Sequence, residues 1–272
     1  MSDDGSTDRT LAILNRFQAT LAPGQMSILA GPRRGFAANF MRLLLNPSIE
    51  GDYYAFCDQD DFWCKEKLFE AVSKLRLLST AEDNATVYAS ARSFVDDDLK
   101  LINTEATSHF VPSFNNALVQ NIAAGNTIVL NNAMRVALLN IGEVDVVSHD
   151  WWVYMVCTGI GGCFYYDNTS YLLYRQHLGN VIGSGASLKS RLSRFKELLQ
   201  GCHRCWTDIN IEALNTAKAA FTEENRITLE RFVLLRDKPA IRRVFELLQN
   251  RIRRQSWFGT VGLLLACLFN KI

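Results

Sequence analysis

Three carboxylates, Asp58, Asp60 and Asp61, stand within four positions directly after the apolar segment 53–57. Carboxylates that lie so close repel one another and lose hydration, so such a group is typical of a site that a cation neutralises. Their hard oxygen atoms favour Mg²⁺ or Mn²⁺ as the cofactor. A solvated acidic turn is the alternative, but the strand expected before the carboxylates and the helix expected after them favour a metal site. A divalent cation at the carboxyl end of a strand predicts a phosphate-bearing ligand such as a nucleoside diphosphate.

Other polar motifs follow one another along the chain. They are Ser-Asp-Asp-Gly-Ser-Thr-Asp-Arg-Thr at 2–10, Gly35 with Asn39, Gly125-Asn126-Thr127, His149-Asp150-Trp151-Trp152, and Tyr174-Arg175-Gln176-His177 followed by Asn180. In this order they resemble the family 2 glycosyltransferases, which have the GT-A fold. The run Asp-Gln-Asp-Asp-Phe-Trp at 58–63 is most similar to the bacterial rhamnosyltransferase-like branch. The resemblance covers residues 2–185.

The resemblance implies a nucleoside diphosphate sugar as the donor and assigns residues to it. Asp60 is the expected metal ligand and His177 the expected second ligand, although a lone histidine is equally typical of a structural role. Asp58 is expected to contact the ribose or the metal, and Asp61 to lie beside the sugar. The other expected donor-binding residues are Asp3, Asp4 as the reader of the base, Gly35, Asn39 and Arg175. Arg175 could pair with the diphosphate through two hydrogen bonds or bridge to a carboxylate in the core.

The acceptor side is predicted around Asp150. An acceptor hydroxyl must lose its proton as it attacks, and Asp150 is the candidate general base. Trp151 and Trp152 are expected to stack on an acceptor sugar, with Gly125 and Asn126 nearby. The alternative is that Asp150 only caps a helix and both tryptophans belong to the core. By resemblance, the activity is an inverting transfer of a sugar, with dTDP-rhamnose as the expected donor, to a saccharide or lipid-linked saccharide in cell-surface polysaccharide synthesis.

Two departures from the family pattern concern the sugar sites. His149 stands where most members carry an acidic residue, as in the rhamnosyltransferase-like branch, and Ala89-Ser90-Ala91 lacks the acidic residue that often follows this strand. A metal-dependent phosphohydrolase would also use clustered aspartates, but we find no nucleophile or second metal cluster for it.

The elements that position these residues predict an α/β fold. Apolar segments alternate with helical segments, which favours a mainly parallel sheet flanked by helices. Leu68, Val72 and Leu75 are expected to face the sheet from one helix. At 272 residues, with 48% hydrophobic content, the chain can form a GT-A domain over residues 1–187 and a helical appendage over 188–272. In related enzymes a strand, a helix and a second strand precede the acidic opening motif. About 30 residues of such a unit are therefore expected upstream, and a catalytically inactive nucleotide-sugar-binding remnant is the alternative function.

Charge and cysteine content restrict the partners and the compartment. The net charge of +1 provides no overall field for nucleic acid, so none is expected as a partner. Seven scattered cysteines and a polar start without a signal-peptide pattern predict a reducing cytoplasm. The apolar run 257–269 is too short to span a bilayer, which needs about 20 residues. With Arg251, Arg253 and Arg254 before it, this run predicts a peripheral helix on the membrane surface, and packing on the protein's own core is the alternative.

Overall fold

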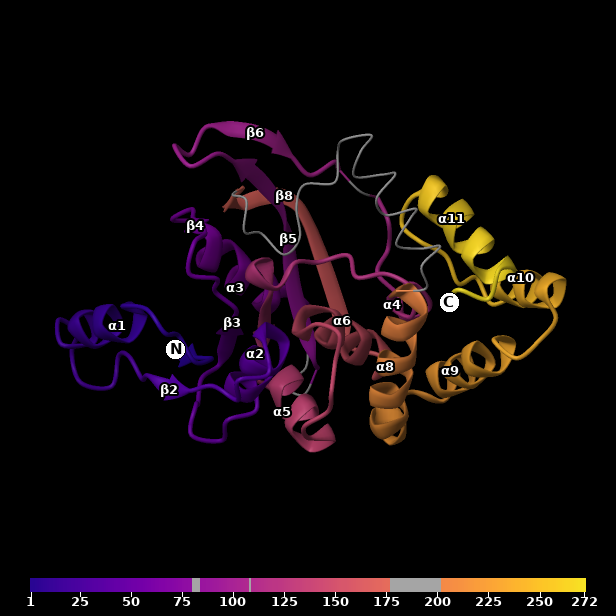
Figure 1. Cartoon of the computed structure of the whole chain (residues 1–272), viewed down its shortest axis with the longest axis horizontal. Helices are drawn as coiled ribbons and strands as arrows, with labels where there is room; N and C mark the ends of the chain where they lie inside the picture. The colour runs from indigo at the N-terminus through magenta and orange to yellow at the C-terminus, as the bar shows by residue number, and fades with distance from the viewer. Residues whose placement is uncertain (80–83, 108, 177–201) are drawn as a thin grey trace.

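The computed structural model describes residues 1–79, 84–107, 109–176 and 202–272 (Figure 1). A six-stranded sheet lies at the centre, with strand order β3-β7-β5-β8-β4 and β6 paired to β5. Its strands are β3 (Tyr53–Ala55), β4 (Phe62–Trp63), β5 (Thr86–Val95), β6 (Leu101–Thr104), β7 (Val129–Asn131) and β8 (Cys163–Arg175). The α/β class is confirmed, but this sheet is mixed rather than mainly parallel, because β5 and β8 are its only parallel pair among the described residues.

The reversed strand β7 determines which residues meet at the sheet's edge. It pairs antiparallel with β3 on one side and with β5 on the other. The start of β7 therefore lies beside the end of β3. The turn Gly125–Thr127, which precedes β7, is thereby brought to the carboxylates that follow β3. Residues more than 60 positions apart in the sequence share one edge of the sheet for this reason.

The first residues form a small unit of their own. Strand β1 (Ser2–Asp3) pairs in parallel with β2 (Leu29–Ala30), with α1 (Thr10–Gln18) between them in sequence. Helix α2 (Phe36–Leu44) follows and packs its Met41 and Leu44 into the core. Figure 1 shows this unit at the end of the molecule opposite the C-terminal helices.

Helix α3 (Lys67–Leu78) covers the sheet with a different face from the expected one. Its buried residues are Lys67, Ala71 and Leu75, spaced four apart, whereas Leu68 is 46% exposed. Lysine can occupy such a position because its stem is apolar. The predicted stripe is therefore correct at Leu75 and wrong at Leu68.

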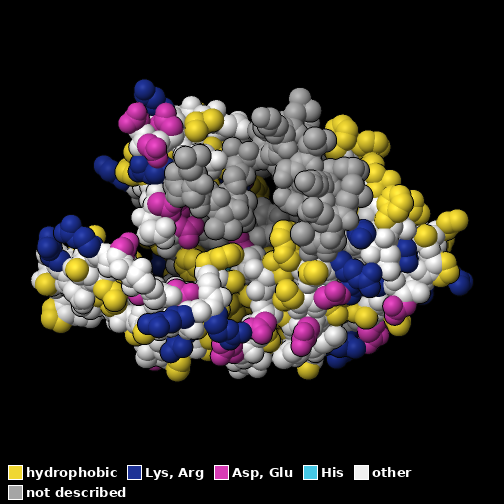
Figure 2. Space-filling view, in the orientation of Figure 1, with side chains coloured by type: hydrophobic (Ala, Val, Ile, Leu, Met, Phe, Trp, Pro, Cys, Tyr) yellow, Lys and Arg dark blue, Asp and Glu magenta, His cyan; other side chains and the backbone are white. Residues whose placement is uncertain are grey.

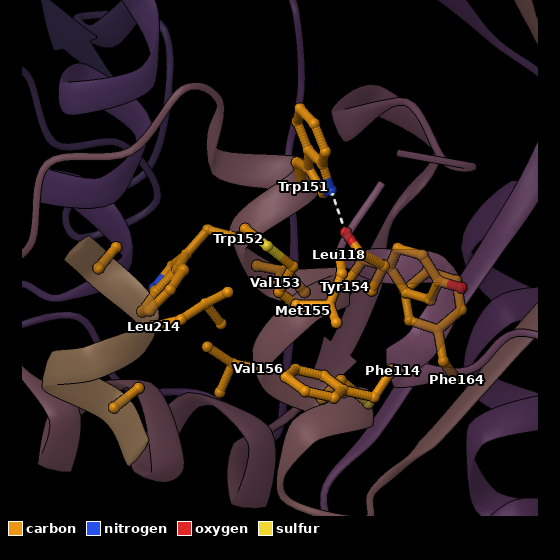
Figure 3. Packing of buried hydrophobic residues seen from close by; sticks show 14 of the residues in the cluster. Phe114, Leu118, Trp151, Trp152, Val153, Tyr154, Met155, Val156, Phe164 and Leu214 are labelled. Carbon is orange, nitrogen blue, oxygen red and sulfur yellow. Dashed lines mark hydrogen bonds between the residues drawn. The ribbon is translucent and has the colours of Figure 1, made fainter. Parts of the chain in front are cut away.

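Helix α6 (His149–Gly159) is the central core element, and every one of its residues is buried. Around it lie α4 (Phe114–Ala117), α5 (Asn132–Ile141) and α8 (Cys202–Ala217). Figure 3 shows Trp152 of α6 against Leu214 of α8. One cluster of buried side chains thus joins the sheet-bearing part to the helical part. The predicted boundary at residue 187 lies outside the described residues.

The chain ends in three further helices, α9 (Glu223–Leu235), α10 (Ala240–Gln249) and α11 (Trp257–Leu268). Residues 188–201 of the expected helical appendage lie outside the described residues. Strand β8 leads directly to the polar motif that begins at Tyr174. Within the described part of the chain, no helix is both long enough and apolar enough to cross a bilayer.

Candidate active site

Asp4 closes the loop in front of α2. Its carboxylate accepts hydrogen bonds from the backbone N–H of Arg33 at 2.6 Å and of Gly35 at 2.8 Å. Gly35 has a φ of 88°, a conformation that glycine adopts without strain. Asp4 thus orders a turn of backbone before α2.

The neighbouring candidates belong to the same unit. Asp3 accepts hydrogen bonds from the backbone N–H groups of Gly5 and Ser6 and from the Ser6 hydroxyl, and the hydroxyl contributes most to lowering the pKa of Asp3. Asn39 donates to the carbonyl of Ser2 at 3.1 Å and accepts from the Ser2 hydroxyl at 2.6 Å. The structure therefore brings together Asp3, Asp4, Gly35 and Asn39, as the resemblance implies.

Four carboxylates converge beyond the end of β3. Burial, together with the charges of Asp60 and Asp150, raises the pKa of Asp58 to about 6. Burial likewise raises the pKa of Asp61 to about 6, with contributions from Asp58 and Asp60. Since Asp150 lies far along the chain, its effect on Asp58 means that both halves of the predicted site share one region. Concentrated negative charge of this kind is typical of a functional site.

The turn before β7 connects these carboxylates. The Asn126 side-chain amide donates a hydrogen bond to Oδ2 of Asp61, and the backbone N–H of Gly125 donates to Oδ2 of Asp150 at 3.0 Å. Asp150 lies in the first turn of α6, after the N-cap residue Ser148, and its Oδ1 accepts from the N–H of Trp151 at 2.7 Å. Gly125 and Asn126 are therefore neighbours of Asp150 and Asp61, respectively.

The prediction that Trp151 and Trp152 stack on an acceptor sugar is corrected by the structure. Both side chains are buried in the core, and Trp152 has no exposed surface. The indole N–H of Trp151 donates to the carbonyl of Ala117 at 2.7 Å, which Figure 3 shows as a dashed line. A sugar ring cannot reach these faces because side chains of the core already cover them. The core interpretation of the two tryptophans is the correct one.

Arg175, at the end of β8, lies beside the carboxylates. It donates to the carbonyl of Asp97 at 2.7 Å and to the carbonyl of Asp60 at 3.4 Å. His177, the expected second metal ligand, and Asn180 lie outside the described residues.

Sequence reasoning missed three polar residues near the carboxylates. Lys67 is buried over the ring of Trp63, with Nζ 3.4 Å from the ring centroid, and burial lowers its pKa to about 8. Arg92 forms an ion pair with Glu105 and lowers the pKa of Asp58 and of Asp61. An arginine inside the otherwise uncharged strand 86–95 was a signal for this role, whereas Lys67 resembled any surface lysine of a helix.

His149 is the third of these residues. Its place in the sequence indicates only the family branch and no role in the site. Its ring stacks on Phe40 with centroids 4.3 Å apart and meets the edge of Phe56 at 4.6 Å. Both ring nitrogens are buried without a hydrogen-bond partner, and burial lowers the pKa. The imidazole next to Asp150 is therefore neutral near pH 7.

The carboxylates after β3 could supply some of the ligands of a hard divalent cation. Asp61 has a buried carboxylate oxygen, Oδ1, without a hydrogen-bond partner, and Asp58 and Asp60 repel it. A cation would relieve this repulsion, and carboxylates are the ligands that Mg²⁺ and Mn²⁺ prefer. Among the described residues, however, no three His, Cys, Asp or Glu side chains are arranged to hold a metal. The remaining ligands would have to be phosphate oxygens, water or residues outside the described part.

Comparison with known proteins identifies the class. Residues 1–140, just over half of the chain, match the model of glycosyl transferase family 2. The chain therefore belongs to this family of GT-A glycosyltransferases, with which its α/β fold agrees. It is similar to the dTDP-rhamnosyl transferase RfbG of Shigella flexneri, with 29% identity over 204 residues that cover 71% of this chain and 68% of that protein. The resemblance to rhamnosyltransferases drawn from the sequence motifs is thus confirmed.

Proposed function

We propose that this glycosyltransferase is inverting and metal-dependent and transfers rhamnose from dTDP-rhamnose to a saccharide acceptor. The observation that carries the proposal is the convergence of Asp58, Asp60 and Asp61 with Asp150 at one edge of the sheet. The three carboxylates after β3 suit a donor with a charged diphosphate, and Asp150 suits removal of the proton from an acceptor hydroxyl. The choice of rhamnose is supported by the similarity to RfbG.

The chemistry follows from where the charges and protons go. The acceptor oxygen forms a bond to the anomeric carbon on the face opposite the diphosphate, while the bond from that carbon to the phosphate oxygen breaks. The acceptor's proton passes to Asp150, and the electron pair of the broken bond remains on the diphosphate. Each Asp150 oxygen accepts one backbone hydrogen bond, so a further lone pair on each remains available for the proton. A single displacement of this kind inverts the anomeric configuration.

Asp60 is the residue we propose to hold the divalent cation, with Asp58 and Asp61 beside it. A bound cation would offset the negative charge that grows on the leaving diphosphate. Asp4 and Asn39 would shape the backbone loop that receives the nucleotide, and Arg175 would supply positive charge near the diphosphate. The acceptor as a saccharide or lipid-linked saccharide, the role in surface polysaccharide synthesis and the cytoplasmic location remain predictions.

Donor binding and turnover separate the proposed roles. Calorimetry with dTDP-rhamnose, with Mn²⁺ or with a chelator, should show metal-dependent binding that Asp60→Asn weakens. Asp150→Asn should retain donor affinity and lose about 10²–10⁴ in turnover, the usual contribution of a general base. The exposed Asp237 provides the control, since Asp237→Asn should change neither quantity.

Three outcomes would contradict the proposal in different ways. Metal-independent binding would reject the role of Asp60, and turnover retained within a few-fold would reject that of Asp150. A wild-type chain that binds the donor but never releases dTDP, even with acceptor extracts, would be the inactive remnant instead.

A further inference from the structure

Helix α11 has two apolar faces, of which only one belongs to the core. Leu263, Ala266 and Cys267 are buried on the inner face. On the outer face, Trp257 is 74% exposed and Phe258 83% exposed, and Leu265, Leu268 and Phe269 continue the exposed side. Packing on the core therefore explains only half of the helix. An outer face of large apolar side chains is typical of a contact with something other than water.

Helix α10 adds a second exposed apolar stripe next to the first. Ile241, Phe245 and Leu248 are spaced four and three residues apart, and Ile241 and Phe245 are 83% and 62% exposed. Arg243 and Leu247 are buried on the opposite side of this helix. Figure 2 shows hydrophobic side chains along the edge of the molecule that Figure 1 assigns to α11 and α10. The two stripes, Ile241, Phe245 and Leu248 with Trp257, Phe258, Leu265, Leu268 and Phe269, are called the α10–α11 face below.

The segment that carries the α10–α11 face has an excess of positive charge. Residues 240–272 hold six Lys and Arg residues and one acidic residue, Glu246, although the whole chain has a net charge of only +1. Glu246 already pairs with Lys238. Arg242, Arg251 and Arg253 of this segment are exposed. Apolar and aromatic side chains flanked by exposed cations match the boundary between the acyl chains and headgroups of an anionic bilayer.

We propose that the α10–α11 face binds the surface of an anionic membrane, with the apolar side chains at the depth of the headgroups and the arginines on the lipid phosphates. A second copy of the chain is a poorer occupant, because a two-fold contact would bring one positively charged face against another. The inference uses helices apart from the carboxylates and does not depend on the proposed donor.

Hydrogen bonds fix the turn between α10 and α11 to the catalytic part. The Asn115 amide donates to the carbonyl of Asn250 at 2.6 Å, and the Asn116 amide donates to that of Arg253 at 2.9 Å. Arg254 donates in return to the carbonyl of Val119 at 3.1 Å. The segment 115–120 continues into the turn that holds Asp61 and Asp150. Membrane binding would therefore orient the catalytic site as well as the two helices.

Vesicle co-sedimentation of the full chain tests the proposal. Vesicles of phosphatidylcholine alone are compared with vesicles that also contain phosphatidylglycerol, and Trp257→Ser with Phe258→Ser is the main variant. We expect wild type to bind the anionic vesicles and salt to weaken this binding. The double variant should lose roughly tenfold or more in vesicle affinity, because two large apolar side chains no longer enter the lipid. Leu77→Ser, which removes an exposed apolar side chain from α3, is the matched control and should bind like wild type.

A second pair of measurements separates lipid binding from other causes. The double variant Arg251→Gln with Arg253→Gln should reduce binding to anionic vesicles only. Brominated lipids should quench tryptophan fluorescence more strongly in wild type than in Trp257→Phe. Thermal melting of every variant checks the fold. Wild type that remains in the supernatant with both vesicles, or equal binding by all variants, would overturn the proposal. A concentration-dependent dimer that the Trp257 and Phe258 substitutions abolish, without vesicle binding, would overturn it in favour of self-association.

Discussion

The backbone N–H of Gly125 donates a hydrogen bond to Oδ2 of Asp150 at 3.0 Å, across 25 residues of sequence. This contact joins the turn before β7 to the first turn of α6. The same turn holds Asp61 through Asn126. The geometry of the proposed base therefore depends on a glycine that has no side chain of its own to contribute.

Replacement of Gly125 by alanine should damage the site. A Cβ at this position would lie 2.3 Å from Nε2 of His149, and His149 cannot move away because it stacks on Phe40. We expect a loss of about 1–3 kcal/mol in the free energy of unfolding and a loss of roughly tenfold or more in turnover as Asp150 shifts. Urea unfolding and donor turnover measure the two effects. Gly262→Ala in α11, where a Cβ would meet nothing within 4 Å, is the control and should be neutral or stabilising.

Asp58→Asn should stabilise the fold but weaken donor binding. The pKa of Asp58 is about 6 in the folded chain against 3.8 as its ordinary value. The folded state therefore binds the proton more tightly, so the wild type loses stability as the pH rises through this window. Above pH 6 the substitution should gain on the order of 1 kcal/mol, less than the full shift because the carboxylate is partly exposed. Melting temperatures from pH 4 to pH 8 measure the gain, and calorimetry should show weaker donor binding; a gain that persists at pH 4 would contradict this explanation.

Lys67→Met tests the buried ammonium over Trp63. The pKa of Lys67 is about 8 in the folded chain against 10.5 ordinarily, with burial as the main cause. The penalty for its charge is complete below pH 8 and disappears as the pH rises toward 10.5. We expect Lys67→Met to gain about 2 kcal/mol at pH 7 and little at pH 10, since methionine keeps the apolar stem. Turnover should fall because Asp61 loses a nearby positive charge, whereas the exposed Lys65→Met should alter neither property.

Arg243→Met should loosen the two last helices. This buried guanidinium donates to the carbonyls of Cys267 at 2.9 Å, Leu268 at 3.0 Å and Lys238 at 2.9 Å. Its removal leaves buried carbonyl groups unpaired, and we expect a cost of about 2–4 kcal/mol in unfolding free energy. Chemical denaturation measures the cost. The exposed neighbour Arg242→Met should remain within about 0.5 kcal/mol of wild type, as surface substitutions usually do.

The parts of the site that sequence reasoning identified have strong local signals. The apolar run before Asp58 predicts a buried strand that ends at the carboxylates. Strand β3 confirms the strand, but Tyr53 and Tyr54 are only half-buried and Ala55 is exposed. The direction of β7 could not be predicted, because a strand of three residues, Val129–Asn131, pairs equally well in either direction from its pattern alone. The contact between Asn126 and Asp61 depends on that direction, and the sequence did not predict it: Asn126 was expected near Asp150 and Asp61 beside the donor sugar.

Two predictions were wrong for physical reasons that the sequence itself contains: the exposure of the two tryptophans of α6 and the buried face of α3. Trp151 and Trp152 begin a helix that is apolar on all sides after Asp150, which is typical of a buried helix rather than of an aromatic platform on a surface. Lys67 is buried and Leu68 is exposed, the reverse of what their side chains suggest. The reason is that Ala71 and Leu75, four residues apart, face the sheet from the side of the helix that contains Lys67. The lysine stem is apolar enough to follow them inside.

The hydrogen bonds between the segment 115–120 and the turn after α10 have a consequence for the choice of acceptor. If the α10–α11 face rests on a bilayer, this rigid connection sets the height of the carboxylates above the lipid. The acceptor hydroxyl would then have to lie at one fixed distance from the bilayer surface. The enzyme would therefore select lipid-linked acceptors by the length of the spacer between the lipid and the terminal sugar. Molecules with identical terminal sugars but shorter or longer spacers would differ in rate, although every contact inside the sugar site were the same.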